Sequence, residues 1–155
     1  MRKSCKNLIF AKKSVIVFFA TYYERRSIDQ LLTLLISSDV KTLVDTRENP
    51  FSKKAEFEMH NLFLKLKESG ISYICAKDLG CPRPLRIATV KSGCYKELWA
   101  WYDRFVLPRL CTLLSVLKSY KPNYAFLCLE KDRNRCHRSR IVYALMVKGY
   151  EITEL

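Results

Sequence analysis

Glycine, proline and histidine are scarce in this chain of 155 residues, which contains only four, five and two of them. Disordered chains have low hydrophobicity, whereas 49% of this chain is hydrophobic and 28% is charged. The composition therefore excludes a disordered protein and indicates a globular one. A chain of this length fits one domain, and such a domain can bury a core without the help of a metal or a disulfide.

Several familiar motifs are missing as well. The sequence has no Walker loop, no dinucleotide-binding Gly-x-Gly-x-x-Gly and no His-Glu-x-x-His zinc motif. Its seven cysteines are irregularly spaced and no two are separated by two residues, which excludes a Cys-x-x-Cys redox motif and a zinc ribbon. Unpaired cysteines of this kind indicate a reduced, cytoplasmic protein.

A membrane-spanning or secretory segment is not expected. The apolar run over residues 15–20 is too short to cross a bilayer. The bulky Tyr22 and Tyr23 follow it where a signal peptide would need small residues for cleavage. We interpret the run as a buried strand and expect a soluble protein with no membrane partner.

Acidic residues are few beside basic ones, 15 against 28, so the formal net charge is +13. Five basic and no acidic residues lie within residues 1–13, which we interpret as a basic N-terminal tail. A single α/β domain over residues 14–155 keeps 23 basic and 15 acidic residues, a charge of +8. An anionic small molecule or a nucleic acid is the predicted partner. A general solubility bias explains the charge equally well, and the oligomeric state is not predicted.

Strand-like and helix-like apolar patterns alternate along the chain, which is typical of a mostly parallel sheet covered by helices. Ser27 and Gln30 form a capping box that predicts the start of a helix. We predict an α/β fold, a Rossmann-like three-layer sandwich with a mostly parallel central sheet of about five strands. The expected strands are 15–20, 42–46, 71–75, 124–129 and 151–155; further helices are expected over 55–69, 95–106 and 135–148, and mostly loop over 77–93.

Ligands of open α/β sheets bind beyond the carboxyl ends of the strands. Two polar segments follow apolar strands in this way, one with Asp45 and Arg47 and the other from Glu130 to Arg138. We therefore expect one cleft that is formed by Asp45, Arg47, Glu130, Cys136, His137 and Arg138. Aromatic residues recur at helical spacing over 95–106 and are interpreted as core packing.

Cys136 is the predicted nucleophile of this cleft. A cap from Asp132 or Asn134 would place it in the first turn of the last helix, where the helix dipole and nearby arginines favour the thiolate. His137 would then act as a base or an acid. The alternative is that Cys136 only packs and His137 contacts solvent.

The predicted catalytic residues are thus Cys136, His137, Glu130 and Asp45, with the two carboxylates orienting the reacting groups. Backbone N–H groups at the start of a helix, together with arginines, also make an anion site. The predicted anion ligands are Arg47, Arg138, Arg135 and Ser52. The same charges form a solvated face in the alternative interpretation.

No cofactor is predicted, and no metal. The nearest candidates for metal ligands are Cys128, Cys136 and His137. Cys128 lies within an apolar strand, a fourth ligand is not evident, and adjacent ligands at the start of a helix diverge.

The same residues carry a resemblance to the domain of unknown function 488 family. The matching segments cover roughly residues 15–155: Arg26-Ser27-Ile28-Asp29, Leu43-Val44-Asp45-Thr46-Arg47 with Pro50 and Ser52, Gly70-Ile71 with Tyr73, Leu79-Gly80, and Leu127-Cys128-Leu129-Glu130 leading to Cys136-His137-Arg138. The resemblance implies an α/β sandwich and a site built from Asp45, Arg47, Glu130, Cys136, His137 and Arg138. It implies no established activity. The family's glycine-containing turn after the first strand is replaced here by Tyr22-Tyr23-Glu24-Arg25.

A more distant likeness to rhodanese-type domains is a fold-level analogy. Those domains also place a cysteine loop before a late helix, at the position of Cys128. The Cys-x5-Arg spacing of cysteine phosphatases would need arginine at position 134, where Asn134 stands.

Two hypotheses of function follow. The first is an enzyme that acts on a phosphorylated or nucleotide-like substrate at the Cys-His-Arg segment. The alternative is a nucleic-acid-binding module that uses its basic surface. A focused pocket favours the enzyme, and a broad basic stripe favours nucleic acid.

Overall fold

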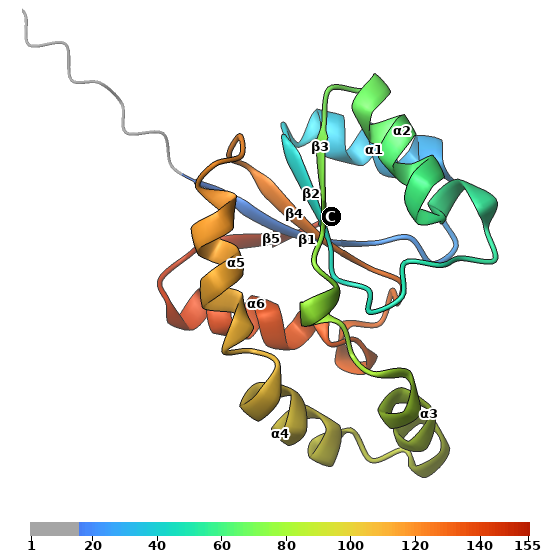
Figure 1. Cartoon of the computed structure of the whole chain (residues 1–155), viewed down its shortest axis with the longest axis vertical. Coiled ribbons are helices and arrows are strands. Elements are labelled where there is room, and N and C mark those ends of the chain that lie inside the picture. The colour runs from blue at the N-terminus through green and yellow to red at the C-terminus, as the bar shows by residue number, and fades with distance from the viewer. Residues whose placement is uncertain (1–15) are drawn as a thin grey trace, which may run out of the picture.

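The computed structural model describes residues 16–155, so the predicted basic tail lies outside the described residues. At the centre is a sheet of five parallel strands in the order β3-β2-β4-β1-β5 (Figure 1). The strands are β1 (Phe18–Tyr22), β2 (Thr42–Asp45), β3 (Ser72–Cys75), β4 (Tyr124–Cys128) and β5 (Ile152–Glu154). The predicted parallel sheet of about five strands is confirmed.

Helices cover both faces of this sheet and complete the predicted three layers (Figure 1). α1 (Ile28–Ser37) and α2 (Met59–Glu68) pack on one face. α5 (Arg109–Leu117) and α6 (Arg138–Val147) pack on the other, where α4 (Tyr95–Phe105) also contributes to the core. α3 (Arg83–Ser92) lies beside α4, away from the sheet (Figure 1).

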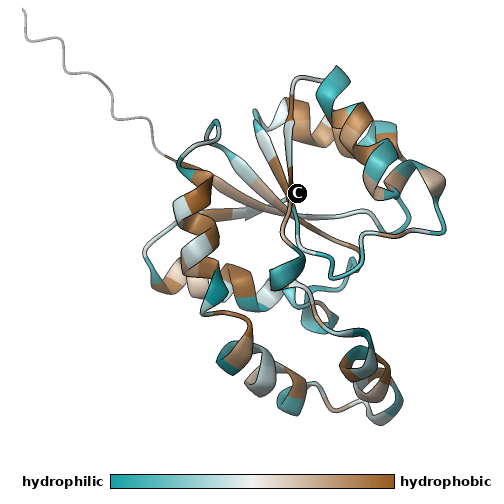
Figure 2. Cartoon of the chain, in the orientation of Figure 1, coloured by the Kyte–Doolittle hydropathy of each residue, from teal (hydrophilic) through white to brown (hydrophobic). Residues whose placement is uncertain are grey.

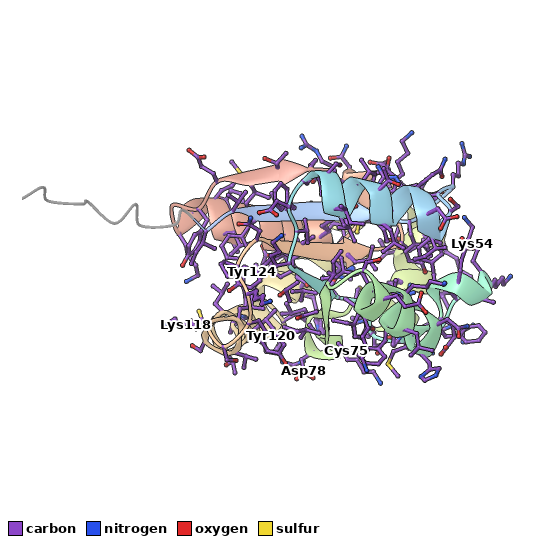
Figure 3. The ribbon with its side chains drawn as sticks, turned by 90° about the horizontal axis from the view of Figure 1, so that it is seen from above. Lys54, Cys75, Asp78, Lys118, Tyr120 and Tyr124 are labelled. Carbon is purple, nitrogen blue, oxygen red and sulfur yellow. The ribbon has the colours of Figure 1, made fainter. Side chains whose placement is uncertain are left out.

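The alternation of side chains along each strand divides the core into two clusters. Leu43 and Leu127 belong to the α1–α2 cluster, whereas Val44 and Phe126 belong to the α5–α6 cluster. Hydrophobic residues accordingly run through the central strands (Figure 2). Tyr124, at the start of β4, lies next to Tyr120, which follows the end of α5 (Figure 3).

The capping box that starts α1 is present as predicted. The Gln30 backbone N–H donates to Ser27 Oγ over 3.2 Å, and the Ser27 N–H donates to Gln30 Oε1 over 2.9 Å. No helix of the described residues is long and apolar enough to cross a membrane.

The prediction of loop over residues 77–93 is wrong for most of its length. A short 3-10 turn (Lys77–Leu79) precedes α3, which has a proline in its first turn, where the missing N–H is tolerated. Gly93 ends the helix with a φ of +69°. The prolines and glycines that suggested a loop therefore lie at or near the two ends of α3.

The start of the last helix was also predicted three residues too early. The side chain of Asp132 does accept a hydrogen bond, from the Asn134 N–H at 2.9 Å, but it caps only a 3-10 turn (Arg133–Arg135). Cys136 follows in an extended conformation, with φ of −121° and ψ of 133°, and α6 begins at Arg138. Cys136 therefore does not lie in a helical turn.

Candidate functional site

A pocket of about 440 Å³ lies between α3, α4 and the segment that follows β4. Its basic residues are Arg83, Arg86 and Lys91 of α3 together with Arg135 of the turn before α6. The Arg135 Nε–H donates to the hydroxyl of Tyr95 over 3.3 Å, which joins that turn to the start of α4. Four cationic side chains thus surround one concave site.

One wall of the pocket is apolar. It is formed by Ile87 and Val90 of α3 and by Leu98 and Trp99 of α4. Ile87 and Val90 are 45% and 61% exposed, which is high for aliphatic side chains within a helix that faces another helix. The pocket therefore combines cationic groups with an uncovered apolar surface.

Glu130 and His137 supply the polar groups of the pocket on the side of the sheet. Cys128, the last residue of β4, lies directly behind them: its Sγ is 3.0 Å from Glu130 Oε2 and 3.7 Å from His137 Nδ1. Cys128 and His137 are only 2% and 5% exposed. The three side chains form a cluster, here called the Cys128 cluster, in which Cys128 and His137 are buried and Glu130 is half-buried at the border of the pocket.

Contacts with Thr46 orient the imidazole of His137. The Thr46 hydroxyl donates to the Leu127 carbonyl over 2.9 Å, so it is left to accept from His137 Nε2, 3.2 Å away. The Thr46 carbonyl also lies 3.0 Å from Nε2. Both neighbours are acceptors, and we therefore assign a hydrogen to Nε2, while the sulfur of Cys128 lies 3.7 Å from Nδ1 and 3.8 Å from Nε2.

Of the two cysteines at this place, Cys128 is the one whose pKa is lowered. Burial raises the pKa of its thiol, but hydrogen bonding from Cys136 and the charge of His137 outweigh burial and hold the pKa well below its ordinary value. Burial and the neighbouring Cys128 instead raise the pKa of Cys136 well above the ordinary value. When two thiols are this close, the first ionisation opposes the second.

The two other members of the cluster respond to that charge. Burial, followed by the charge of Cys128, raises the pKa of Glu130 to about 7. Burial lowers the pKa of His137, but the negative sulfur outweighs it and the net direction is upward. The directions of these shifts favour a thiolate–imidazolium pair, beside a carboxyl group whose pKa is raised to about 7.

The premise that made Cys136 the predicted nucleophile is wrong. The residue is 1% exposed, lies outside the helix and has a raised pKa. The lowered pKa belongs instead to Cys128, whose sulfur lies beside His137 and which was interpreted from the sequence as a residue of an apolar strand. A cysteine at the carboxyl end of a central strand was the signal that could have identified it.

The predicted single cleft is also wrong, because Asp45 and Arg47 face the α1–α2 layer. Two bonds join their side chains, with Arg47 Nε to Asp45 Oδ1 at 2.8 Å and Nη2 to Oδ2 at 2.6 Å. Arg47 also donates to the Tyr23 hydroxyl and the Phe57 carbonyl, while Tyr73 donates to Asp45. Their hydrogen-bonding groups are thus used inside the fold, away from the pocket.

Two further residues of the predicted site, Arg138 and Ser52, also lie outside the pocket. Arg138 is 1% exposed and ties the Glu130 carbonyl (2.9 Å) to Thr21 and Glu154, so it holds the end of the sheet together and does not line the pocket. Ser52 accepts a hydrogen bond from the Lys54 N–H, outside the pocket. Of the predicted residues, the structure brings Glu130, His137 and Arg135 to the pocket, and it places Cys136 beside Cys128 and His137.

Sequence reasoning missed the contribution of α3 and α4. Arg83 and Arg86 were assigned to a loop, although their spacing of three residues after Pro82 places them on one side of a helix. The aromatic residues of α4 were assigned to the core, which holds for Tyr102, whereas Tyr95 and Trp99 border the pocket.

One group of side chains could hold a metal ion. Ligand atoms of Cys128, Cys136 and His137 all lie within 4.8 Å of one another, and all three residues are buried. The expected divergence of Cys136 and His137 assumed that both lie on one helix. The turn before α6 removes that geometry.

Comparison with known proteins gives one match. The model of a family described as domain of unknown function DUF488 matches residues 27–145, a stretch that includes α3, α4 and the Cys128 cluster. No curated protein and no solved structure matches the chain.

Proposed function

This chain belongs to the family described as domain of unknown function DUF488, and from that premise we propose that it is an enzyme acting on a small phosphorylated or nucleotide-like substrate. The observation that carries the proposal is the meeting of cationic side chains, an apolar wall and the Cys128 cluster at one pocket. Convergent polar groups in an apolar pocket at strand ends are typical of active sites.

Arg86 supports an anionic substrate. Among the described residues its buried Nε has no hydrogen-bond partner, and the side chain lines the pocket. A buried unpaired donor is unfavourable, by about 1–3 kcal/mol or more when charged. A phosphate or carboxylate oxygen would satisfy this donor, and Arg83 and Arg135 would add charge at the rim.

The apolar wall supports a substrate with a ring or another apolar part. The volume of about 440 Å³ lies within the range of small-molecule sites. Trp99 offers an aromatic surface, and the exposed Ile87 and Val90 would be covered by a bound ring. A nucleoside monophosphate combines both features.

In the proposed reaction, Cys128 is the nucleophile. Its sulfur attacks the electrophilic atom of the substrate, a bond from sulfur to that atom forms, and the bond to the leaving group breaks. The leaving oxygen takes the proton that Glu130 shares with the sulfur, since Oε2 is 3.0 Å from Sγ. Water then releases the transferred group and returns the thiol. His137 holds the charge on the sulfur throughout, and because Cys128 is buried, Glu130 must rotate to admit the substrate.

The test is the binding of adenosine monophosphate, measured by calorimetry against adenosine and inorganic phosphate. We expect the monophosphate to bind more tightly than either part, and Arg86→Leu to weaken it about tenfold, since a charge-assisted bond contributes about 1.5–3 kcal/mol. Lys118→Leu, on the exposed end of α5, is the matched control. Equal binding by the wild type and Arg86→Leu would contradict the proposal.

The alternative of a nucleic-acid-binding module gives a different result. Binding through phosphates alone would follow the +8 charge of the body, persist in Arg86→Leu and fall steeply with salt. A filter-binding assay with generic single-stranded and duplex DNA at several salt concentrations distinguishes the two hypotheses.

A further inference from the structure

We propose that Cys128, Cys136 and His137 bind one Zn²⁺ ion whose fourth position is open to a water molecule from the pocket. The inference goes beyond the proposed function, and the zinc-bound form is a state in which Cys128 is not free to attack a substrate. It rests on the positions of three side chains from β4 and from the segment between β4 and α6.

The donor set is the first argument. Two sulfurs and one imidazole nitrogen lie within 4.8 Å of one another, and the three residues are 1–5% exposed. Two cysteines and one histidine are a frequent zinc set, and a buried site protects the ion from competing water. The same soft donors disfavour Mg²⁺ and Ca²⁺, which need oxygen ligands.

The distances are the second argument. Bonds of about 2.3 Å from zinc to sulfur and about 2.0 Å to nitrogen, at the tetrahedral angle, place the two atoms about 3.5 Å apart. The Cys128 Sγ and His137 Nδ1 atoms are 3.7 Å apart. Nε2 of the same ring is 3.8 Å from this sulfur, so the imidazole must turn before Nδ1 and the sulfur can bind one ion.

The partners of the ligands are the third argument. A histidine that binds a metal usually donates its other N–H to a carbonyl or carboxylate, which fixes the ring. His137 Nε2 does this toward the Thr46 carbonyl at 3.0 Å. The sulfur of Cys136 accepts from the Arg138 backbone N–H at 3.4 Å and lies 4.0 Å from its Nη1, contacts that stabilise negative sulfur.

Glu130 lies beside this group but is not one of its members. Its Oε2 is 3.0 Å from Cys128 Sγ and its side chain borders the pocket, which leaves the fourth position of the ion to water from the pocket. An ion at this position would engage the sulfur of Cys128, so zinc and alkylating reagents would exclude one another.

The experiment uses the full chain with Cys5, which lies outside the described residues, and the exposed Cys75, Cys94 and Cys111 changed to serine, which limits competition from other thiols. After treatment with a chelator, the protein is titrated with Zn²⁺ against a coloured indicator, and separately with Co²⁺. We expect one equivalent of zinc, and cobalt spectra with sulfur-to-metal charge transfer and strong tetrahedral bands.

Ligand variants give the assignment. Cys136→Ser and His137→Gln should each lower the zinc affinity by more than about 100-fold, whereas loss of a residue that only hydrogen-bonds to a ligand costs about 10–100-fold. Cys81→Ser is the matched control, since Cys81 is also buried and borders the pocket but does not belong to the trio, and it should leave the affinity unchanged.

Two results would overturn the inference: cobalt spectra without the sulfur band, or zinc affinity that is unchanged in a folded Cys136→Ser variant. The cobalt spectrum needs no variant, so it decides the matter even if Cys136→Ser does not fold. The proposed function is tested separately, since Arg86→Leu should weaken nucleotide binding and leave zinc binding unchanged.

Discussion

Cys128 and Cys136 are both buried, yet their ionisation differs. The imidazole of His137 and the hydrogen bond from Cys136 favour the thiolate of Cys128, while that charge suppresses ionisation of Cys136. Spacing along the chain could not reveal which sulfur faces the histidine, because that depends on the turn between the 3-10 segment and α6.

We predict that alkylation distinguishes these thiols. In chelator-treated protein, a small uncharged reagent should label Cys128 with a pH midpoint below the ordinary thiol value of about 9. Cys81, for which burial raises the pKa to about 12, is the matched buried comparison and should require higher pH. Mass spectrometry of labelled peptides gives both profiles.

The variant His137→Gln should move the Cys128 midpoint to higher pH, because it removes the positive partner of the thiolate. Labelling of Cys136 at lower pH than Cys128 would show that the assignment of charge in the cluster is wrong.

A second prediction concerns Glu130, whose pKa is raised from 4.5 to about 7 in the folded protein. A raised carboxyl pKa contributes stability at low pH that is lost as pH rises from about 4.5 through 7. Glu130→Gln, which cannot ionise, should therefore stabilise the protein at pH 8 relative to pH 5, by on the order of 1–3 kcal/mol. Thermal unfolding at the two pH values measures this difference, and an equal effect at both would contradict it.

At the scale of elements, α3 depends on the loop after β2. The Glu48 carboxylate accepts from the Arg83 backbone N–H over 2.9 Å, and thereby satisfies a free donor at the start of the helix. Gly80 lies against the same residue, since a Cβ at this position would be 2.3 Å from the Glu48 backbone nitrogen. Close packing of two loops therefore positions the arginines of the pocket.

Gly80→Ala should destabilise the protein by about 1–3 kcal/mol and weaken binding of adenosine monophosphate, because the backbones of both loops must separate. Gly93→Ala is the control: no atom lies within 4 Å of its Cβ, and only the positive φ of +69° disfavours the substitution, by about 1–2 kcal/mol. Chemical denaturation and calorimetry separate the two variants. Weakened binding in Gly93→Ala alone would contradict this account.

For the whole molecule, the sheet separates a buried ion pair from the pocket. The side chains of Asp45 and Arg47 lie on the α1–α2 face, where Tyr23, Phe57 and Tyr73 complete their hydrogen bonds. The Cys128 cluster lies on the opposite face, where the ring of His137 approaches Tyr102 of the α5–α6 core. The buried ion pair thus lies on one face of the sheet, and the Cys128 cluster lies on the other.

Arg47→Leu should therefore act on stability and not on ligand binding. Removing one partner of a buried pair leaves Asp45 uncompensated, and we expect a loss of about 3–5 kcal/mol. Denaturant unfolding measures the loss, and calorimetry at low temperature tests whether the folded variant still binds adenosine monophosphate. Loss of binding in folded protein would show that Arg47 does contact the ligand.

Local patterns in the sequence were sufficient to determine the layers of this protein: the capping box at Ser27, the apolar strands and the leucine faces of the helices act over a few residues and predict the α/β sandwich. They also selected Glu130 and His137, because both follow the end of a strand. Tertiary structure alone decided on which face of the sheet each strand residue lies. It also placed the arginines of α3 at the pocket beside the end of β4, and the sulfur of Cys128 beside His137. The physical reason is range: strand pairing and helix packing bring together residues far apart in the chain, and burial and charge at the resulting contacts set the chemistry of the site.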